Sequence, residues 1–368
     1  MARLDIPVTA VRASAYRIPT DQPEADGTLA WNATTLVVVE VDAGGHTGLG
    51  YTYADAALLP LIDRTLRGVI EGGDVMSPSR TSEGLWHAVR NLGRSGLAAC
   101  AISAIDTALW DLKARVLGLS LAALLGPLRD RVPVYGSGGF TAYDDGRLRE
   151  QLGGWAEQDG CRWVKMKIGG EPSRELARIE DVLEAIGEAT LFVDANGAYS
   201  SRQAIALATQ MADLEIGWFE EPVSSDDLQG LLRVRTALDA AGTPMDVAAG
   251  EYAYTLDDFR HLLQAGAVDV LQADLTRCGG VTGFMQAAAL CESFHVGLSA
   301  HCAPALHLPV ACAAPRLLHQ EWFHDHARIE ALLFDGAPRL QQGHITPDLD
   351  APGHGLQFRH ADAQRHII

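Results

Sequence analysis

The chain has 368 residues, of which 48% are hydrophobic and 21% are charged, so it is long enough for a large core and for two domains. Its formal net charge of -18 argues against nucleic-acid and membrane-surface partners, since both require clustered Lys and Arg. The sequence contains no apolar run of the roughly 18 to 20 residues that a membrane helix needs and no apolar secretory signal at its start, so we expect a cytoplasmic protein.

Residues 1 to about 130 predict an α+β domain. The stretch "TTLVVVEVDAGGHTGLGYTY" at 34–53 indicates two strands joined by a tight turn at Gly44 and Gly45. The cluster of Gly45, Gly48 and Gly50 is interpreted as part of this hairpin, because it lacks the spacing and the following helix of a phosphate-binding loop. Helix-period segments follow at 56–70, 80–92 and 96–118.

From residue 131 the chain repeats a unit of short apolar run, loop and amphipathic segment. Strands that alternate with helices in this way predict a parallel sheet, and eight of them predict a closed TIM barrel. The helix-period segments include 173–189 and 201–215. The apolar runs lie at 131–137, 162–168, 189–196, 216–222, 245–251, 268–274, 296–301 and 317–322.

Polar side chains end these runs, and the C-terminal ends of barrel strands are where active sites are built. From the second run on, the polar residues at the strand ends follow one another along the chain at intervals of about one strand-helix unit. A single acid at a strand end is usually a helix cap or a solvated residue, but a whole series is not expected by accident. The series is Lys165 and Lys167, Asp194 and Asn196, Glu220 and Glu221, Glu251, Asp274, His301 and Glu321.

Three of these carboxylates predict a metal centre. Asp194, Glu220 and Glu251 end successive strands, and adjacent strands lie about 4.8 Å apart, so the three acids can converge on one cation. A donor set made only of carboxylate oxygens suits Mg²⁺ and does not suit Zn²⁺. The alternative is an ion-pair network in which Lys or Arg takes the place of the metal.

The two lysines of "WVKMKIGG" (163–170) point to the same face of their strand, because side chains at i and i+2 do so. At ~7 Å and an effective dielectric of about 20, two ammonium groups repel by roughly 2.4 kcal/mol. We therefore expect Lys165 to bind a substrate carboxylate and to lower the pKa of Lys167, which would act as a base.

His301 and Asp274 end neighbouring strands across the barrel from the lysines. An aspartate that accepts from one imidazole nitrogen fixes the tautomer and leaves the other nitrogen free to transfer a proton. A lysine on one side and a His-Asp pair on the other would bracket a carbon acid, an arrangement that suits proton abstraction α to a carboxylate. A structural core histidine is the alternative.

Taken in order, these motifs resemble the mandelate racemase branch of the enolase superfamily. The matching pieces are "KMK", "DAN", "FEEP", "AAGE", "QAD", "SAH" and "HQEW", together with "AISAIDTALWDLKA" in the first domain. The resemblance implies a modified TIM barrel, (β/α)7β, at 131–337, with an α+β capping domain at 1–130 that a tail at about 338–368 joins.

The resemblance also implies roles for individual residues. Asp194, Glu220 and Glu251 would bind Mg²⁺, Lys167 would be the base on one face, and His301, oriented by Asp274, would act on the other. Glu321 would hydrogen-bond a substrate carboxylate oxygen and should then be protonated. Asn196 is counted with the substrate-binding residues Lys165 and Glu321, although it and Glu221 are expected to lie behind the direct ligands.

The loop that would close over the substrate, "IPTDQPEADGTLAW" at 18–31, is polar and acidic. It favours a polyhydroxylated acid over an aromatic substrate such as mandelate. The expected reaction is dehydration of a sugar acid, an aldonate or aldarate, to a 2-keto-3-deoxy acid. A racemase, epimerase or cycloisomerase would share its first step.

Two other classes of protein remain as alternatives. A metal-dependent hydrolase on a similar barrel would need an H-x-H pair on the first strand, and "PVYGSGG" has none. A non-catalytic sugar-acid binder would have no need for both bases. We expect a small-molecule carboxylate as the partner and a homo-oligomer as the assembly.

Two further groups are interpreted as structural. The six scattered cysteines contain no C-x-x-C pair and are expected to be buried thiols. His319, His324 and His326 could suggest a second metal site, but they follow the last catalytic strand and are expected to be structural or solvated.

Overall fold

A closed barrel of parallel strands forms the centre of the chain, as the alternating pattern predicts. The computed structural model describes residues 5–368, and in that part each barrel strand pairs with the next and the last strand pairs with the first. The expected (β/α)7β barrel is therefore confirmed. Its strands are β4 (Val132–Gly138), β5 (Trp163–Lys167), β6 (Thr190–Asp194), β7 (Trp218–Glu220), β8 (Asp246–Ala249), β9 (Val270–Ala273), β10 (Gly297–Ala300) and β11 (Leu317–Phe323).

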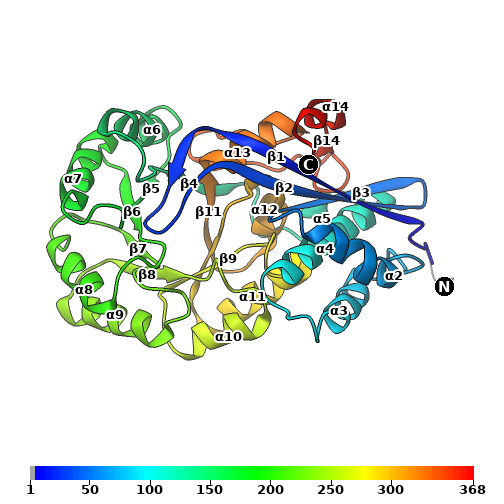
Figure 1. Cartoon of the computed structure of the whole chain (residues 1–368), viewed down its shortest axis with the longest axis horizontal. Helices are drawn as coiled ribbons and strands as arrows, with labels where there is room; N and C mark the ends of the chain where they lie inside the picture. The colour runs from blue at the N-terminus through cyan, green and yellow to red at the C-terminus, as the bar shows by residue number, and fades with distance from the viewer. Residues whose placement is uncertain (1–4) are drawn as a thin grey trace.

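Helices connect successive strands and pack outside the barrel, as Figure 1 shows for the green and yellow part of the chain. Several begin at side-chain caps. Ser200 with Gln203 and Thr255 with Asp258 form reciprocal capping boxes, which satisfy amides at the starts of two of these helices. The connecting helices are α6 (Asp145–Glu157), α7 (Glu175–Ile186), α8 (Ser201–Gln210), α9 (Leu228–Ala241), α10 (Leu256–Gln264), α11 (Gly280–Phe294) and α12 (Pro304–Ala313).

The barrel interior is layered, because inward-facing side chains recur every second residue along a strand. A lower layer is aromatic: the Phe192 and Trp218 rings stack at 4.6 Å, and His319 lies 5.4 Å from Trp218. Two residues further along the same strands stand Asp194, Glu220 and Glu321. The hydrophobic plug of the barrel thus forms a floor beneath a polar upper layer.

The N-terminal domain is built on an antiparallel sheet of β1 (Ala10–Ala25), β2 (Ala30–Ala43) and β3 (His46–Tyr53). The hairpin expected at 34–53 is confirmed, and its turn residues Gly44 and Gly45 have φ values of 58° and 79°. The helices at its side are α1 (Leu58–Leu61), the π-helical turn η1 (Ile62–Leu66), α2 (Arg67–Ile70), α3 (Pro78–Ala88), α4 (Leu97–Leu117) and α5 (Leu121–Leu125).

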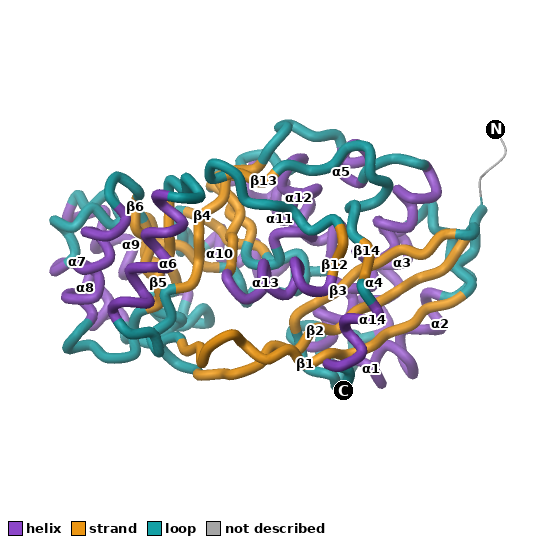
Figure 2. Tube along the Cα trace, turned by 90° about the horizontal axis from the view of Figure 1, so that it is seen from above, coloured by secondary structure: helices purple, strands orange, loops and turns teal. Residues whose placement is uncertain are grey.

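The stretch at 18–31, expected to be a loop, is instead the far end of the β1–β2 hairpin. We call residues 18–31 the arm. Figures 1 and 2 show β1 and β2 reaching from the N-terminal sheet to the barrel. The pairing register shifts between Pro19 and Glu24, so this part of β1 bulges away from regular pairing with β2.

The C-terminal segment returns to the N-terminal domain. After β11 come α13 (His324–Leu333), β12 (Phe334–Asp335), β13 (His344–Ile345), β14 (Gln357–Phe358), α14 (His360–Ala363) and the 3-10 turn η2 (Gln364–His366). The amide of Ile368 donates to the carbonyl of Ala15 at 3.0 Å, and Arg115 Nη2 donates to the carbonyl of Leu356 at 2.8 Å. The division at residues 130 and 337 remains our proposal.

All six cysteines, which lie within the described residues 5–368, are free and buried, and this confirms the expectation of buried thiols. Within this range, no helix is both long enough and apolar enough to cross a bilayer.

Candidate active site

The polar residues predicted at the strand ends meet in one buried cluster at the C-terminal end of the barrel. Register places Lys167 of β5 beside Asp194 of β6, and Asp194 beside Glu220 of β7. Since the strands continue in sequence order around the barrel, the remaining residues follow in the same direction. We call this set the strand-end ring: Lys165, Lys167, Asp194, Glu220, Glu251, Asp274, His301 and Glu321, each at most 6% exposed.

Three acids of the ring form a site that fits a hard divalent cation. One carboxylate oxygen each from Asp194, Glu220 and Glu251 lies within 4.8 Å of the other two. Oxygens around an octahedral Mg²⁺ ion are about 2.9 to 4.1 Å apart, given Mg–O distances of about 2.0–2.1 Å. Small side-chain rotations would bring the three acids into that range. Oε2 of Glu251 lies 3.2 Å from Nε2 of His301, so a cation at this oxygen would lie next to the imidazole.

Both lysines donate to these acids. Lys165 Nζ lies 2.7 and 2.6 Å from the two carboxylate oxygens of Glu220 and 2.9 Å from Oε1 of Glu321. Lys167 Nζ donates to Oδ2 of Asp194. The alternative considered from the sequence, acids paired with lysines, is therefore present in the structure. A cation and the two ammonium groups would compete for the same oxygens.

The expected lowering of the lysine pKa is wrong for this arrangement. Burial and the Lys165 charge do lower the pKa of Lys167, but Asp194, Glu220 and Glu251 outweigh them and the net shift is upward. The pKa of Lys165 is likewise raised, because Glu220 and Glu321 overcome the effect of burial. Repulsion between the two lysines is therefore a weaker effect than the attraction of the acids that hold each of them.

His301 has the orientation that its pairing with Asp274 predicts. Its Nδ1 lies 2.8 Å from Oδ2 of Asp274, and its Nε2 points to Oε2 of Glu251 at 3.2 Å. Burial lowers the pKa of His301, but Cys302, Glu251, Glu321 and the hydrogen bond to Asp274 together raise it further than burial lowers it. Protonated His301 can therefore serve as a proton donor toward the centre of the ring.

Glu321 is held from three sides. Its Oε1 accepts from Ser137 Oγ at 2.6 Å, and its Oε2 accepts from the Cys302 amide at 2.8 Å. Burial alone would raise the pKa of Glu321, but Lys165 and His301 outweigh it and lower the pKa. The expectation that Glu321 is protonated therefore does not hold here, because the positive charges of Lys165 and His301 favour its ionised form.

Asn196 lies beside the metal-ligand candidates rather than among them. Its backbone N–H donates to Oδ1 of Asp194 at 2.9 Å, and its φ is 46°. Glu221 has a φ of 36°, and burial followed by the charges of Glu251 and Asp194 raises its pKa well above the usual value. Left-handed backbone at two such neighbouring positions is typical of functional sites.

The N-terminal domain holds the loop that leads from β9 to α11. Thr52 Oγ1 donates to the Thr276 carbonyl at 2.8 Å, and Ser103 Oγ accepts from the Gly279 amide at 2.8 Å. Asp106 accepts from both the amide and the hydroxyl of Thr282, at 2.9 and 2.6 Å. Side chains of one domain therefore cap a helix of the other.

The loop between β9 and α11 also forms hydrogen bonds to Asp274 of the His-Asp pair. Thr276, which Thr52 holds, donates its amide and its hydroxyl to Oδ1 of Asp274, each at 2.7 Å. Asp274 in turn orients His301. A chain of hydrogen bonds thus runs from the N-terminal sheet to the imidazole.

The arm reaches the rim of the barrel at its tip. The amide and hydroxyl of Thr141 donate to the carbonyls of Ala25 and Asp26, each at 2.8 Å. A Cβ at Gly27 would lie 2.7 Å from the carbonyl oxygens of both Ile168 and Ala195, so only glycine fits this close approach. Ile168 directly follows Lys167, and Ala195 directly follows Asp194. The arm therefore packs against the ends of two catalytic strands.

Two family models match the chain. The model described as the mandelate racemase / muconate lactonizing enzyme N-terminal domain matches residues 12–126, and the one described as enolase C-terminal domain-like matches 147–363. The chain belongs to the mandelate racemase / muconate lactonizing enzyme family. The resemblance seen in the motifs is thereby confirmed.

Curated relatives in this family include two with named reactions. The chain is 32% identical over 356 residues to the 3,6-anhydro-alpha-L-galactonate cycloisomerase of Streptomyces coelicolor, covering 94% of this chain and 95% of that protein. It is 32% identical over 322 residues to the L-talarate/galactarate dehydratase of Salmonella typhimurium, covering 84% of this chain and 79% of that protein.

Solved structures of similar proteins share the whole fold. A mandelate racemase/muconate lactonizing enzyme-like protein from Rubrobacter xylanophilus has a TM-score of 0.95 and 48% identity, covering 98% of this chain and all 100% of that one. A racemase from Streptomyces coelicolor, crystallised with bound magnesium, has a TM-score of 0.91 and 30% identity, with coverage of 98% and 100%.

Sequence reasoning passed over two residues of this mandelate racemase family site. Ser137 ends the first barrel strand, and the strand-end rule that selected the other residues applies to it equally. Cys302 was counted only as a buried thiol, yet its Sγ lies 3.3 Å from Nε2 of His301. Its position directly after His301 was the available signal.

The three histidines near the last strand do not form a site together. His319, expected to follow the last barrel strand, instead lies within β11 in the aromatic floor, where its Nδ1 is 2.9 Å from Ser299 Oγ. His326 stacks on Tyr53 with ring centroids 3.5 Å apart, while Nε2 of His324 lies 3.0 Å from Oδ2 of Asp21. His319 and His326 are therefore structural, as expected.

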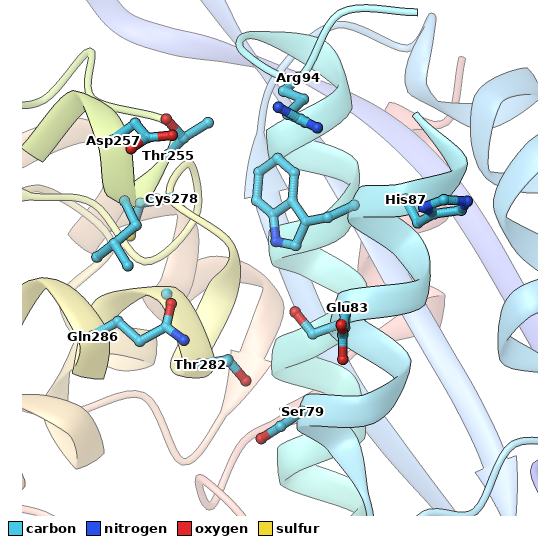
Figure 3. A pocket seen from close by; sticks show the side chains of 13 residues that line it. Ser79, Glu83, His87, Arg94, Thr255, Asp257, Cys278, Thr282 and Gln286 are labelled. Carbon is cyan, nitrogen blue, oxygen red and sulfur yellow. The ribbon is translucent and has the colours of Figure 1, made fainter. Parts of the chain in front are cut away.

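A cleft of about 570 Å³ lies between the two domains, away from the ring. Figure 3 shows Glu83, His87 and Arg94 on one side of it and Thr255, Asp257 and Gln286 on the other. Its lining contains no member of the strand-end ring, so it is not the reaction chamber.

Proposed function

We propose that the protein is a magnesium-dependent sugar-acid dehydratase, which removes the proton α to the substrate carboxylate and expels the neighbouring hydroxyl. The observation that carries the proposal is the order around the barrel. Lys167 contacts Asp194 at one end of the row of three acids, and His301 contacts Glu251 at the other. Two proton-transferring groups thus flank a carboxylate centre that fits Mg²⁺.

Magnesium held by Asp194, Glu220 and Glu251 would supply positive charge that stabilises the anion left by proton removal. The chain's own side chains supply the remainder. Lys165 would bind the substrate carboxylate, and Glu321 and Asn196 would contact the substrate beside it. Metal binding would free Lys167 from Asp194, which the structure shows to be its principal hydrogen-bond acceptor among the acids.

The proposed reaction balances as follows. The amine of Lys167 takes the proton from C2, and the electron pair of that bond forms a double bond to C3. The hydroxyl at C3 leaves with a proton from His301 Nε2, giving water. The resulting enol takes up a proton at C3 from Lys167 and releases its C2 hydroxyl proton to His301, which gives the 2-keto-3-deoxy acid and restores both side chains. With the opposite configuration at C2, His301 would take the proton instead.

Cycloisomerisation is the second candidate, because the 32% identical cycloisomerase is matched over 94% of this chain. It shares proton transfer at the carbon next to the carboxylate but releases no water. The two reactions therefore differ in the mass of the product.

The test is to incubate the purified protein and Mg²⁺ with aldonates, aldarates and their anhydro and lactone forms. We expect a product lighter by one water that reacts with semicarbazide. Lys167→Ala should abolish it, whereas Lys113→Ala, at the one lysine outside the strand-end ring, should not. A product of unchanged mass would select the cycloisomerase or a racemase, and ligand binding without hydrogen exchange in D₂O would select a non-catalytic binder.

Cytoplasmic location, homo-oligomeric assembly and the lack of nucleic-acid and membrane partners remain predictions. The net charge of -18 supports the last of these.

A further inference from the structure

A second group of potential metal ligands lies where the arm meets the barrel. Asp21 and Glu24 come from β1, and His324 is the first residue of α13. Each offers one ligand atom, and these atoms lie within 4.8 Å of one another. The cluster joins two segments that are about three hundred residues apart in the chain.

Glu24 is the unusual member of this cluster. It is 1% exposed, and although Oε2 accepts from Trp31 Nε1 at 2.7 Å, Oε1 has no hydrogen-bond partner within residues 5–368. A buried carboxylate oxygen without a partner is destabilising, and a bound cation would satisfy it.

The surrounding charges leave an excess of acid. Arg147 Nη2 is 4.0 Å from Asp21 but its Nη1 is 3.0 Å from Glu150, and Arg328 pairs with Asp325. Asp21, Glu24, Glu150 and Asp325 thus face two guanidinium groups. Four carboxylates and two guanidinium groups leave two excess negative charges, which one divalent cation would balance.

We propose that Asp21, Glu24 and His324 form a second cation site, which takes Zn²⁺ and fastens the arm to the barrel. The donor set separates this site from the carboxylate centre. Imidazole is a good ligand for Zn²⁺, and one imidazole with two carboxylates leaves a fourth position for water. Mg²⁺ prefers oxygen ligands alone and so favours Asp194, Glu220 and Glu251.

The position of His324 determines what the ion would do. His324 lies three residues beyond Glu321 on the same strand-to-helix segment, and Asp21 and Glu24 lie on the arm whose tip packs beside Lys167 and Asp194. Already in this structure, Arg328 Nη2 donates to the Pro19 carbonyl at 2.8 Å. Zinc would add a stronger link at the same place and hold the arm over the strand-end ring.

The test measures zinc directly and does not depend on the catalytic proposal. Protein is equilibrated with Zn²⁺ in excess Mg²⁺, freed of unbound metal, and analysed by inductively coupled plasma mass spectrometry. We expect one equivalent of zinc in the wild type, in Glu220→Gln and in the matched control His46→Ala. His324→Ala and Glu24→Gln should each weaken zinc binding at least tenfold.

Hydrogen exchange of residues 18–31 provides the second readout. Zinc should slow exchange of the arm in the wild type and in Glu220→Gln, and should have no effect in His324→Ala. The proposal is overturned if the wild type retains no zinc, or if Glu220→Gln loses the zinc while His324→Ala keeps it. Should Glu24→Gln fail to fold, His324→Ala decides the result alone, because that side chain is only partly buried.

Discussion

Asp274 holds His301 through a 2.8 Å hydrogen bond from Nδ1, and Asp274 is itself held by both polar groups of Thr276. The imidazole therefore has a fixed tautomer, with Nε2 directed into the strand-end ring. Burial acts to raise the pKa of Asp274, but the hydrogen bond and charge of His301, together with the charges of Arg277 and His307, outweigh it and the net shift is downward. Asp274 thus stays ionised as the partner of a cationic imidazole.

The first prediction concerns this pair. Asp274→Asn should lower kcat by about 10²- to 10⁴-fold, the usual contribution of a positioned acid or base, with a much smaller change in KM. The reason is that an amide can leave the wrong imidazole nitrogen protonated. Steady-state kinetics checks the result, with the exposed Asp213→Asn as control. A kcat within about threefold of the wild type would show that Asp274 does not orient the catalytic group.

The second prediction concerns metal binding and stability. Adding Mg²⁺ at about 100 times its dissociation constant should stabilise the folded protein by about 2.7 kcal/mol. Asp194→Asn should remove most of this gain, because Asp194 is one of three buried carboxylates that fit the ion. Thermal unfolding with and without Mg²⁺ measures the effect. An equal gain in Asp194→Asn and in wild type would place the ion elsewhere.

The third prediction concerns the tip of the arm. Gly27→Ala should push the arm away from the barrel rim, since its Cβ would come within 2.7 Å of two backbone carbonyl oxygens. Overpacking of this kind destabilises by about 1 to 3 kcal/mol. Faster hydrogen exchange in residues 18–31 and a raised KM are expected. Gly68→Ala is the matched control, because a Cβ there meets nothing within 4 Å.

The fourth prediction uses Asp106, whose pKa burial raises to about 7. Because the ordinary pKa of Asp is about 3.9, the folded state binds this proton more tightly than the unfolded state does. The group's contribution to the free energy of unfolding should therefore fall by about 1.4 kcal/mol per pH unit from about pH 4 to pH 7, and then level off.

Urea unfolding of the wild type and Asp106→Asn between pH 5 and pH 8 measures this slope as the difference between the two proteins. Asp213→Asn serves as control and should follow the wild type at every pH. Parallel stability curves for wild type and Asp106→Asn would mean that Asp106 is ionised throughout.

The strand ends could be predicted from sequence because barrel geometry converts position along the chain into position in space. Once Asp194, Glu220 and Glu251 end consecutive parallel strands, their convergence follows from the strand spacing alone. Lys165 and His301 reach the same end of the barrel for the same reason. The alternation of short apolar runs with helix-period segments along the chain is enough to predict this.

The pKa values of the lysines and the conformation of the arm could not be predicted in this way. The net shift in the pKa of Lys167 depends on its distances to acids on other strands, which the periodicity of the sequence does not encode. Residues 18–31 are polar and bulged, so they lack the alternation that identifies a strand, and the structure shows that β2 and the barrel rim hold them in place. Their conformation is imposed by tertiary contacts.

Hydrogen bonds join the N-terminal domain to the segment between β9 and α11, through Thr52, Ser103 and Asp106. Because of them, we expect that the barrel does not keep its active-site structure when it is separated from that domain. A barrel expressed from residue 131 onward would lose every one of these partners. Gly279 and Thr282 would then have to satisfy their amides elsewhere, and the backbone beneath Asp274 would be free to shift. Grafting this barrel onto a foreign N-terminal domain would succeed only if that domain supplied a donor for the Thr276 carbonyl and acceptors for Gly279 and Thr282.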